Sequence, residues 1–361
     1  YVRQWIIENF HIIGLVELPR RIFLKSDADL RSNILFAERR KDDKSKNYPI
    51  HAELVRKVGY KLGKGFSTIP LRDEKTGLEV RDPNTGSILV DTDFQRVKSN
   101  FEAFIKITGH DSFTEWNGAY LSDITEHPQL DMKPRRLTRN ALMNLNSILT
   151  TPHKQLYEIA DILTDTTNFA DVVHADEQIY LVEGQDIRAL EGTVVLKASE
   201  KRWQAEVRKT DKGYHLQKKD IIIGLVRPER RNIGLYLDDK SNVFGSPDGI
   251  AVGRQKDPKY PIEWIFQVLR TEQTRIQFWT ESGGTSYGKL TIDQIKNVFV
   301  SIPSESEIKA ITQKVQNWVT SQQSVQNNFN EIWREEDKRA ILNSPITGLE
   351  GFAISTDDEE S

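Results

Sequence analysis

Nearly continuous apolar positions near the start of the chain predict two strands. Residues 12–18 (IIGLVEL) are almost all apolar, which is typical of a strand buried on both faces of an α/β sheet. Pro19 ends this run, and residues 33–37 (NILFA) predict a second strand before a charged stretch. Further along, DFQRVKSNFEAFIKI has the three-and-four spacing of an amphipathic helix, and RLTRNALMNLNSIL predicts another helix after Pro134.

From residue 152 to residue 303 the pattern changes to short apolar runs separated by turn residues. The runs QIYLVEG, GTVVLKA, DIIIGLV, IGLYLD, GIAVGR and NVFVSIP each predict a strand. One longer amphipathic stretch, PIEWIFQVLRTEQTRIQFW, predicts a single helix that interrupts them. This part of the chain therefore predicts an α+β domain.

The last regular element is a long helix with a defined start. Ser304 and Glu307 form an S-x-x-E capping box, in which each side chain accepts from the other residue's backbone N–H. Its apolar positions follow alternating steps of three and four with one polar interruption at Gln322, a pattern typical of a coiled-coil seam and also of a helix docked on its own domain. Both interpretations stay open. The apolar positions are Ile308, Ile311, Val315, Trp318, Val325, Phe329 and Ile332.

Composition limits the class of protein. With 361 residues, 37% of them hydrophobic, the chain is long enough for two or three domains with apolar cores. It has no cysteine, which excludes disulfides and thiolate chemistry. No apolar run reaches the length of a membrane span, and no charged-then-apolar leader opens the chain, so we expect a cytoplasmic protein without a membrane partner. Because the first residue is Tyr1, we expect a piece of a longer polypeptide.

Charge is unevenly distributed along the chain. The formal net charge is −3, but residues 197–231 contain eleven Lys and Arg against five Asp and Glu, and the C-terminal tail is acidic. A local basic face on a near-neutral protein can bind phosphate, and it can equally be a solvated surface.

Few motifs point to catalysis. The histidines lack metal-ligand spacing and no G-x-S-x-G nucleophile turn occurs, so we predict no catalytic residue and no metal ligand. One alternative is a metal-dependent nuclease, because Asp248, Asp257 and Lys259 spell its acidic pair and lysine. That alternative requires the two carboxylates to share one metal ion.

The order of several phrases resembles adenine-N6 DNA methyltransferases of restriction–modification systems. The opening WIIENFHIIGLVELPRRIF with SNILFAERR looks like the end of their catalytic domain, and HAELVRKVGYKLGKG with GSILVDTDFQRVKSNFEAF resembles the segment after it. From about residue 151 the chain resembles half of a type I specificity subunit, meaning a target recognition domain with its spacer helix. The phrases that carry this are QLYEIADIL, IYLVEGQDIRALEG, YHLQKKDIIIGLVRP and SGGTSYGKLTIDQIKNVFVSIPSESEIKAI.

The resemblance also has departures. The family's glycine-rich S-adenosylmethionine loop and its Asn-Pro-Pro motif are absent, so this chain is not expected to bind the cofactor or to methylate DNA alone. S-adenosylmethionine is expected for the complete enzyme. Phe23 matches the position where the family stacks an aromatic ring on the extruded adenine. The other interpretation of Phe23 is a core residue that closes the strand end.

The resemblance implies a double-stranded DNA ligand. A recognition tip in SGGTSYG would reach base edges from the start of a rigid helix, and basic residues would contact phosphates or bases. Arg227 and Arg230 are the preferred pair, because arginine reads guanine with two hydrogen bonds. The predicted DNA-binding residues are Lys201, Arg202, Arg208, Lys209, Lys218, Lys219, Arg227, Arg230, Arg231, Gly283, Gly284, Thr285, Ser286 and Tyr287.

These observations predict a mixed α/β and α+β chain. We expect the remnant of a Rossmann-like methyltransferase sheet at 1–46, a connecting region at 47–150, a target recognition domain at 151–303, a spacer helix at 304–342 and an acidic tail at 343–361. Expected partners are DNA, a methyltransferase core, and a second specificity half, a self-dimer or a restriction subunit. The alternative function is an assembly scaffold that pairs through its long helix and has little DNA affinity.

Overall fold

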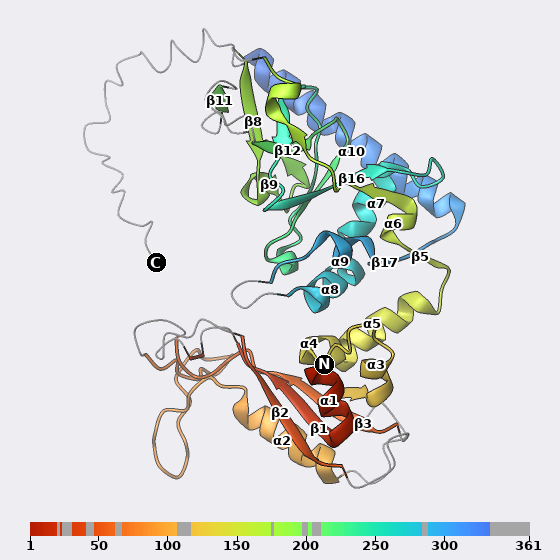
Figure 1. The fold of residues 1–361 in the computed structure, drawn as a ribbon. Coiled ribbons are helices and arrows are strands. Elements are labelled where there is room, and N and C mark those ends of the chain that lie inside the picture. Colours follow the sequence, from red (N-terminus) through yellow and green to blue (C-terminus); the bar gives the residue numbers. More distant parts are fainter. Residues whose placement is uncertain are drawn as a thin grey trace, which may run out of the picture.

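A computed structural model describes residues 1–19, 22–23, 31–40, 47–61, 67–106, 117–174, 177–196, 201–203, 211–283 and 288–332, with side chains of 201–203 and 325–332 left out. The chain is a mixed helix and strand protein with two units (Figure 1). An N-terminal unit contains one sheet, and a second unit from about residue 151 contains two larger sheets, a short strand pair and half of the described α-helices. None of the described helices is long and apolar enough to cross a membrane.

The N-terminal unit is built on a four-stranded mixed sheet. Both strands predicted near the start of the chain are present, and the first is preceded by α1 (Val2–Asn9). The sheet separates two apolar clusters, and α2 (Phe94–Lys106) covers one face. Gly14 lets α2 approach closely, since an added Cβ would lie 2.8 Å from the Phe101 ring. The strand order is β2 (Asn33–Arg39), β1 (Phe10–Glu17), β3 (Pro49–Leu54), β4 (Gly118–Tyr120), with only β1 and β3 parallel.

Strand β2 is the edge of this sheet and is exposed on both faces. Ile34, Leu35 and Phe36 are 38%, 40% and 37% exposed, although successive side chains of a strand point to opposite faces. An edge strand with apolar side chains on both faces presents unpaired backbone groups to another strand. Among the described strands, none pairs with the outer edge of β2.

An arm of paired segments projects from this sheet between residues 58 and 92. Its two turns, RDEKTG and RDPNTG, share one design, in which Asp73 and Asp82 accept backbone N–H groups and thereby lower the pKa of their own carboxyls. Gly77 and Gly86 adopt the positive φ that these turns require.

The second unit has a layered core in which one strand, β13 (Ile221–Gly224), is central. Ile221 and Ile223 face a cluster shared with the helices, while Ile222 faces a cluster between the two sheets. A six-stranded sheet has the order β6 (Ala160–Ile162), β16 (Ile250–Gln255), β13, β14 (Ile233–Leu235), β10 (Thr193–Val194), β9 (Ile187–Arg188). A five-stranded sheet has the order β11 (Lys201–Trp203), β8 (Gln178–Val182), β15 (Val243–Gly245), β12 (Lys212–His215), β7 (Thr167–Asn168). A short pair, β17 (Phe299–Ser301) and β5 (His153–Gln155), completes the unit.

The single helix predicted over PIEWIFQVLRTEQTRIQFW is wrong, because the structure has two helices there. Helix α7 (Ile262–Leu269) ends at Arg270, and α8 (Glu272–Glu281) begins after Thr271. The Thr271 hydroxyl accepts from the backbone N–H of Thr274, an N-cap that starts a new helix. Side-chain periodicity alone did not reveal this cap. Helix α9 (Ile292–Lys296) follows.

The long final helix, α10 (Glu305–Ile332), starts at the predicted capping box. Ser304 N donates to Glu307 Oε2 at 2.9 Å, and Glu307 N donates to Ser304 Oγ at 3.4 Å. Ile308 and Val315 are buried in the core shared with α7, so the first half of the apolar seam is docked on its own domain. The side chains of Val325, Phe329 and Ile332 lie outside the described residues.

His51 on β3 predicts a pH-dependent stability. Its side chain is fully buried between Phe101 and Phe104, and burial lowers its pKa from 6.5, while nearby Glu53 raises it to a smaller extent. The unfolded state therefore binds a proton below pH 6.5 that native His51 does not. We expect the free energy of unfolding to fall between pH 6.5 and 5.5, by up to about 1.4 kcal/mol per pH unit from this residue.

The measurement is chemical denaturation at both pH values with His51→Leu and with the exposed control His174→Gln. The pH dependence should shrink only in His51→Leu. Equal pH dependence in both variants and the unchanged protein would contradict the prediction.

Candidate nucleic-acid interface

An arginine-rich turn follows β13 at one end of the six-stranded sheet. The turn, residues 226–232, contains a 3₁₀ helix, η6 (Pro228–Arg230), between Arg227 and Arg231, which both have left-handed backbones with φ of 55° and 54°. Left-handed conformations are disfavoured for residues with a Cβ, and surrounding structure must impose them. Here Gly224 N donates to Asn232 O at 2.7 Å, which closes the turn. This arginine turn is one half of the candidate interface.

Gly283, Gly288 and Lys289, the described ends of the glycine-rich segment and here called the glycine tip, lie beside the arginine turn. Gly283 and Lys289 exchange two backbone hydrogen bonds of 3.0 and 2.8 Å, and Arg227 N donates to Gly288 O at 2.8 Å. The two segments that the sequence analysis singled out separately thus form one ladder. Gly284, Thr285, Ser286 and Tyr287 lie outside the described residues.

Acidic groups on α8 neutralise part of this surface. The Glu272 carboxylate accepts from both Arg275 and Arg231, and these arginines lower its pKa to about 2. Arg270 lies nearby, and its side chain is committed to backbone carbonyls, donating to Ile233 O at 2.8 Å and to Leu190 O at 3.1 Å. Arg231 is therefore already paired before any ligand binds.

Two other cations of the interface are more accessible. Arg230 is exposed, and no described residue pairs with its guanidinium. Lys289, which the sequence analysis missed, is exposed at the base of the tip. The signal was present in the sequence, since Lys289 directly follows SGGTSYG, but only the pairing with the arginine turn indicates a shared surface.

The other predicted DNA-binding residues are not brought to this turn. Lys218 and Lys219 precede β13, at its opposite end, and pair with Asp239 and Glu263 at 2.7 Å each. Strand β11, with Lys201 and Arg202, lies at the edge of the five-stranded sheet, and Arg208 and Lys209 lie outside the described residues. Of the predicted set, the structure brings together Arg227, Arg230, Arg231 and Gly283.

Phe23 lies beyond β1 in the N-terminal unit. It is 46% exposed, whereas its neighbour Ile22 packs against the apolar cluster under α2. The expectation of a core residue at this position is therefore wrong, because Ile22 closes the strand end instead. An exposed ring face is what stacking on an extruded base requires.

The nuclease alternative is contradicted by the positions of its acids. Asp248 precedes β16 and Asp257 follows it. A six-residue strand spans about 20 Å, so these carboxylates are too far apart to share one metal ion. The Asp257 carboxylate instead accepts from Lys259 N at 2.9 Å and stabilises a turn.

One group of potential ligands appears between the units. Atoms of His127, Asp131 and Glu281 lie within 4.8 Å of one another. The Lys133 ammonium group already supplies positive charge there, 3.0 Å from Asp131. Burial raises the pKa of Glu281 and lowers that of His127.

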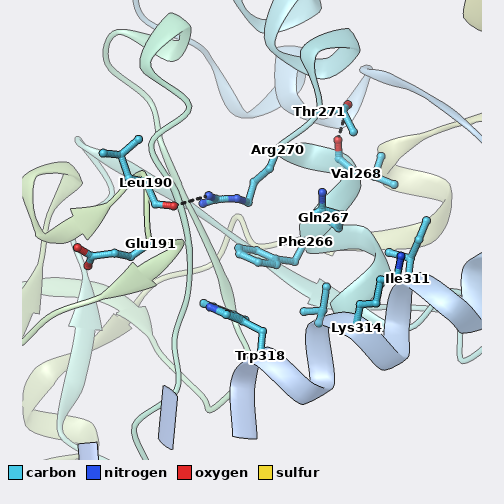
Figure 2. A pocket seen from close by; sticks show the side chains of 11 residues that line it. Leu190, Glu191, Phe266, Gln267, Val268, Arg270, Thr271, Ile311, Lys314 and Trp318 are labelled. Atoms are coloured by element: carbon cyan, nitrogen blue, oxygen red, sulfur yellow. Dashed lines mark hydrogen bonds between the residues drawn. The ribbon is translucent and has the colours of Figure 1, made fainter. Parts of the chain in front are cut away.

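A mainly apolar pocket of about 570 Å³ lies beside α10 (Figure 2). Phe266 stacks on Trp318 with ring centroids 5.7 Å apart, and the Arg270 guanidinium lies 5.3 Å from the centre of the Phe266 ring. Leu190 and Lys314 line the pocket from other elements. Most of its lining comes from α7 and α10.

Comparisons with known proteins give partial structural similarities. No family model and no curated protein matches the sequence. The HsdS subunit from Thermoanaerobacter tengcongensis aligns with a TM-score of 0.38 and 20% identity over 53% of this chain and 46% of that chain. A structure of the type I R-M system aligns with a TM-score of 0.39 and 19% identity over 54% and 50%.

A third similarity is to the type IIG restriction endonuclease BpuSI, with a TM-score of 0.34 and 9% identity over 87% of this chain and 39% of that chain. The chain thus spans about half the length of the first two structures. These TM-scores are low, and the similarities carry no argument about function.

Glu272→Gln should strengthen DNA binding. Without the carboxylate, Arg231 and Arg275 lose their shared partner and become available to phosphate. We expect the affinity for duplex DNA near physiological salt to rise about threefold to tenfold, and the slope of log K against log salt to steepen by about one. Fluorescence anisotropy with a labelled duplex measures both quantities.

The matched control is Asp239→Asn, which releases Lys218 at the opposite end of β13. It should change affinity little. An equal gain in both variants would mean that net charge, and not the arginine turn, governs binding.

Proposed function

We propose that this chain is a DNA sequence-recognition module of a restriction–modification system that carries the end of an adenine-N6 methyltransferase domain. The observation that carries the proposal is the ladder that joins the arginine turn to the glycine tip. Through this ladder, Arg227, Arg230 and Lys289 lie beside the glycine tip. Arginines supply donors for guanine and phosphate, and glycines permit close approach of a backbone.

The N-terminal sheet supports the methyltransferase part of the proposal. Its antiparallel strands β1 and β2 coincide with the two phrases, WIIENFHIIGLVELPRRIF and SNILFAERR, that resemble the end of a methyltransferase domain. The exposed edge at β2 fits a sheet that a further part of the enzyme completes. The missing cofactor and Asn-Pro-Pro motifs assign methylation to that other part. Phe23 would then stack on the extruded adenine.

A second function, the assembly scaffold, is favoured by a different surface. The pocket beside α10 and the exposed Leu190 offer apolar contacts to a second specificity half, a second copy or a methyltransferase subunit. Sedimentation distinguishes the two functions. A strictly monomeric chain that binds a defined duplex would contradict the scaffold function.

Selection of bound duplexes from a random DNA library, near physiological salt, tests the recognition function. We expect enrichment of one short sequence. Arg227→Ala and Arg230→Ala should each weaken binding to the enriched duplex by about 1–3 kcal/mol or relax the preference at one base position. Substitution of a residue that contacts only phosphate should instead weaken binding to all duplexes equally and reduce the slope of log K against log salt by about one.

Lys218→Ala serves as the control, because it removes a cation from the far end of β13. Sequence-blind binding by the unchanged protein would contradict autonomous recognition, and unchanged affinity in both arginine variants would exclude the arginine turn as the contact.

A further inference from the structure

One buried arginine joins the N-terminal sheet to the base of the glycine tip. Arg135 belongs to α4 (Pro134–Leu137), and its side chain is 3% exposed. Its Nε donates to Glu17 Oε2 at 2.9 Å, and its Nη2 pairs with Glu17 Oε1. On the other side, Nη1 lies 3.4 Å from Ser282 Oγ and 3.5 Å from the carbonyl oxygen of Trp279. The guanidinium therefore contacts both units at once.

On the N-terminal side, Glu17 is the last residue of β1. Its backbone carbonyl accepts from Val55 N at 2.9 Å, and its carboxylate lies 3.7 Å from Arg31 Nε, ahead of β2. Leu18 and Ile22 then enter the apolar cluster, and Phe23 follows at the surface. The Arg135–Glu17 pair thus fixes the strand end from which the Phe23 segment departs.

On the recognition side, Ser282 is the C-cap of α8, and its hydroxyl donates to Trp279 O at 2.8 Å. Gly288 packs so closely on it that an added Cβ would lie 2.9 Å from Ser282 Oγ. Gly288 O in turn accepts from Arg227 N. A displacement of Ser282 would therefore move Gly288 and, through the hydrogen bond to Arg227 N, the arginine turn.

We propose that Arg135 is a positioning residue that couples the arginine turn and glycine tip to the end of β1, ahead of Phe23. DNA on the recognition surface would thereby set the position of the target-base aromatic. An arginine suits this task, since its planar fork can bind a carboxylate with two nitrogens while a third nitrogen reaches another partner. The inference rests on the proposed function for its ligand, whereas the coupling depends only on contacts within the chain.

Neighbouring links allow the units to stay docked when Arg135 is changed. Lys133 Nζ donates to Glu281 O at 3.1 Å, and Asn144 Nδ2 donates to Gln273 O at 3.1 Å. Arg135→Lys keeps the positive charge but loses the fork. This variant therefore tests the geometry of the link and not the presence of the interface.

The first test needs no DNA and measures amide hydrogen exchange by mass spectrometry. Arg135→Lys should raise exchange at Gly283 and Lys289 by at least about fivefold, because their mutual hydrogen bonds lose a fixed base. Reciprocally, Ser282→Ala should raise exchange at Leu18 and Val55. The matched control, Arg96→Lys, alters another strand-glutamate pair of the same sheet, with Glu53, and should leave the tip unchanged.

Unchanged exchange at the tip in Arg135→Lys would overturn the proposal. The same increase in Arg96→Lys would also overturn it, because it would indicate a general loss of stability.

The second test is a double-variant cycle on affinity for the duplex enriched in the selection. Both Glu17 and Ser282 contact Arg135, so Glu17→Gln and Ser282→Ala act on one link. If both residues act through Arg135, the fold-loss of affinity in the double variant should be smaller than the product of the two single fold-losses, by a factor of at least about five. A product reproduced within about twofold would mean independent residues and would overturn the coupling. If the unchanged protein prefers no duplex, the proposed function fails, while the exchange test still decides on the link.

Discussion

The second unit depends on the burial of one short strand on both of its faces. Strand β13 pairs with β14 and β16, and its side chains alternate between the core under the helices and the core between the sheets. Because the side-chain period is two, a slip of one residue would exchange these faces and bring apolar groups into the wrong layer. The register therefore fixes where β13 ends and where the arginine turn begins.

Local sequence patterns predicted the individual strands and helices of this unit better than the contacts between them. The runs around β8, β13 and β16 and the Ser304–Glu307 box were read correctly, since alternation and capping act over a few residues. The break at Thr271 was missed because one hydroxyl hydrogen bond decides it. The ladder between the arginine turn and Gly288 joins segments far apart in sequence, and no local pattern encodes it.

Several of the described basic residues predicted to form one face are paired with acidic residues. Lys218, Lys219 and Arg231 each have an acidic partner, so their charges are already balanced in the free protein. Any phosphate that approached these cations would have to compete with those carboxylates, so the pairs weaken non-specific attraction to anions. Arg135 could not be singled out from the sequence either, because its role arises from Glu17 and Ser282 meeting across the two units.

The exposed edge at β2 has a consequence for the behaviour of the isolated chain. Unpaired strand edges are templates for other strands, and Ile34, Leu35 and Phe36 add apolar side chains on both sides of this one. Two copies that meet through β2 would satisfy backbone groups and cover apolar surface together. We therefore expect the isolated chain to aggregate more as its concentration rises. The charged residues Glu38 and Arg39 at the strand end oppose this aggregation.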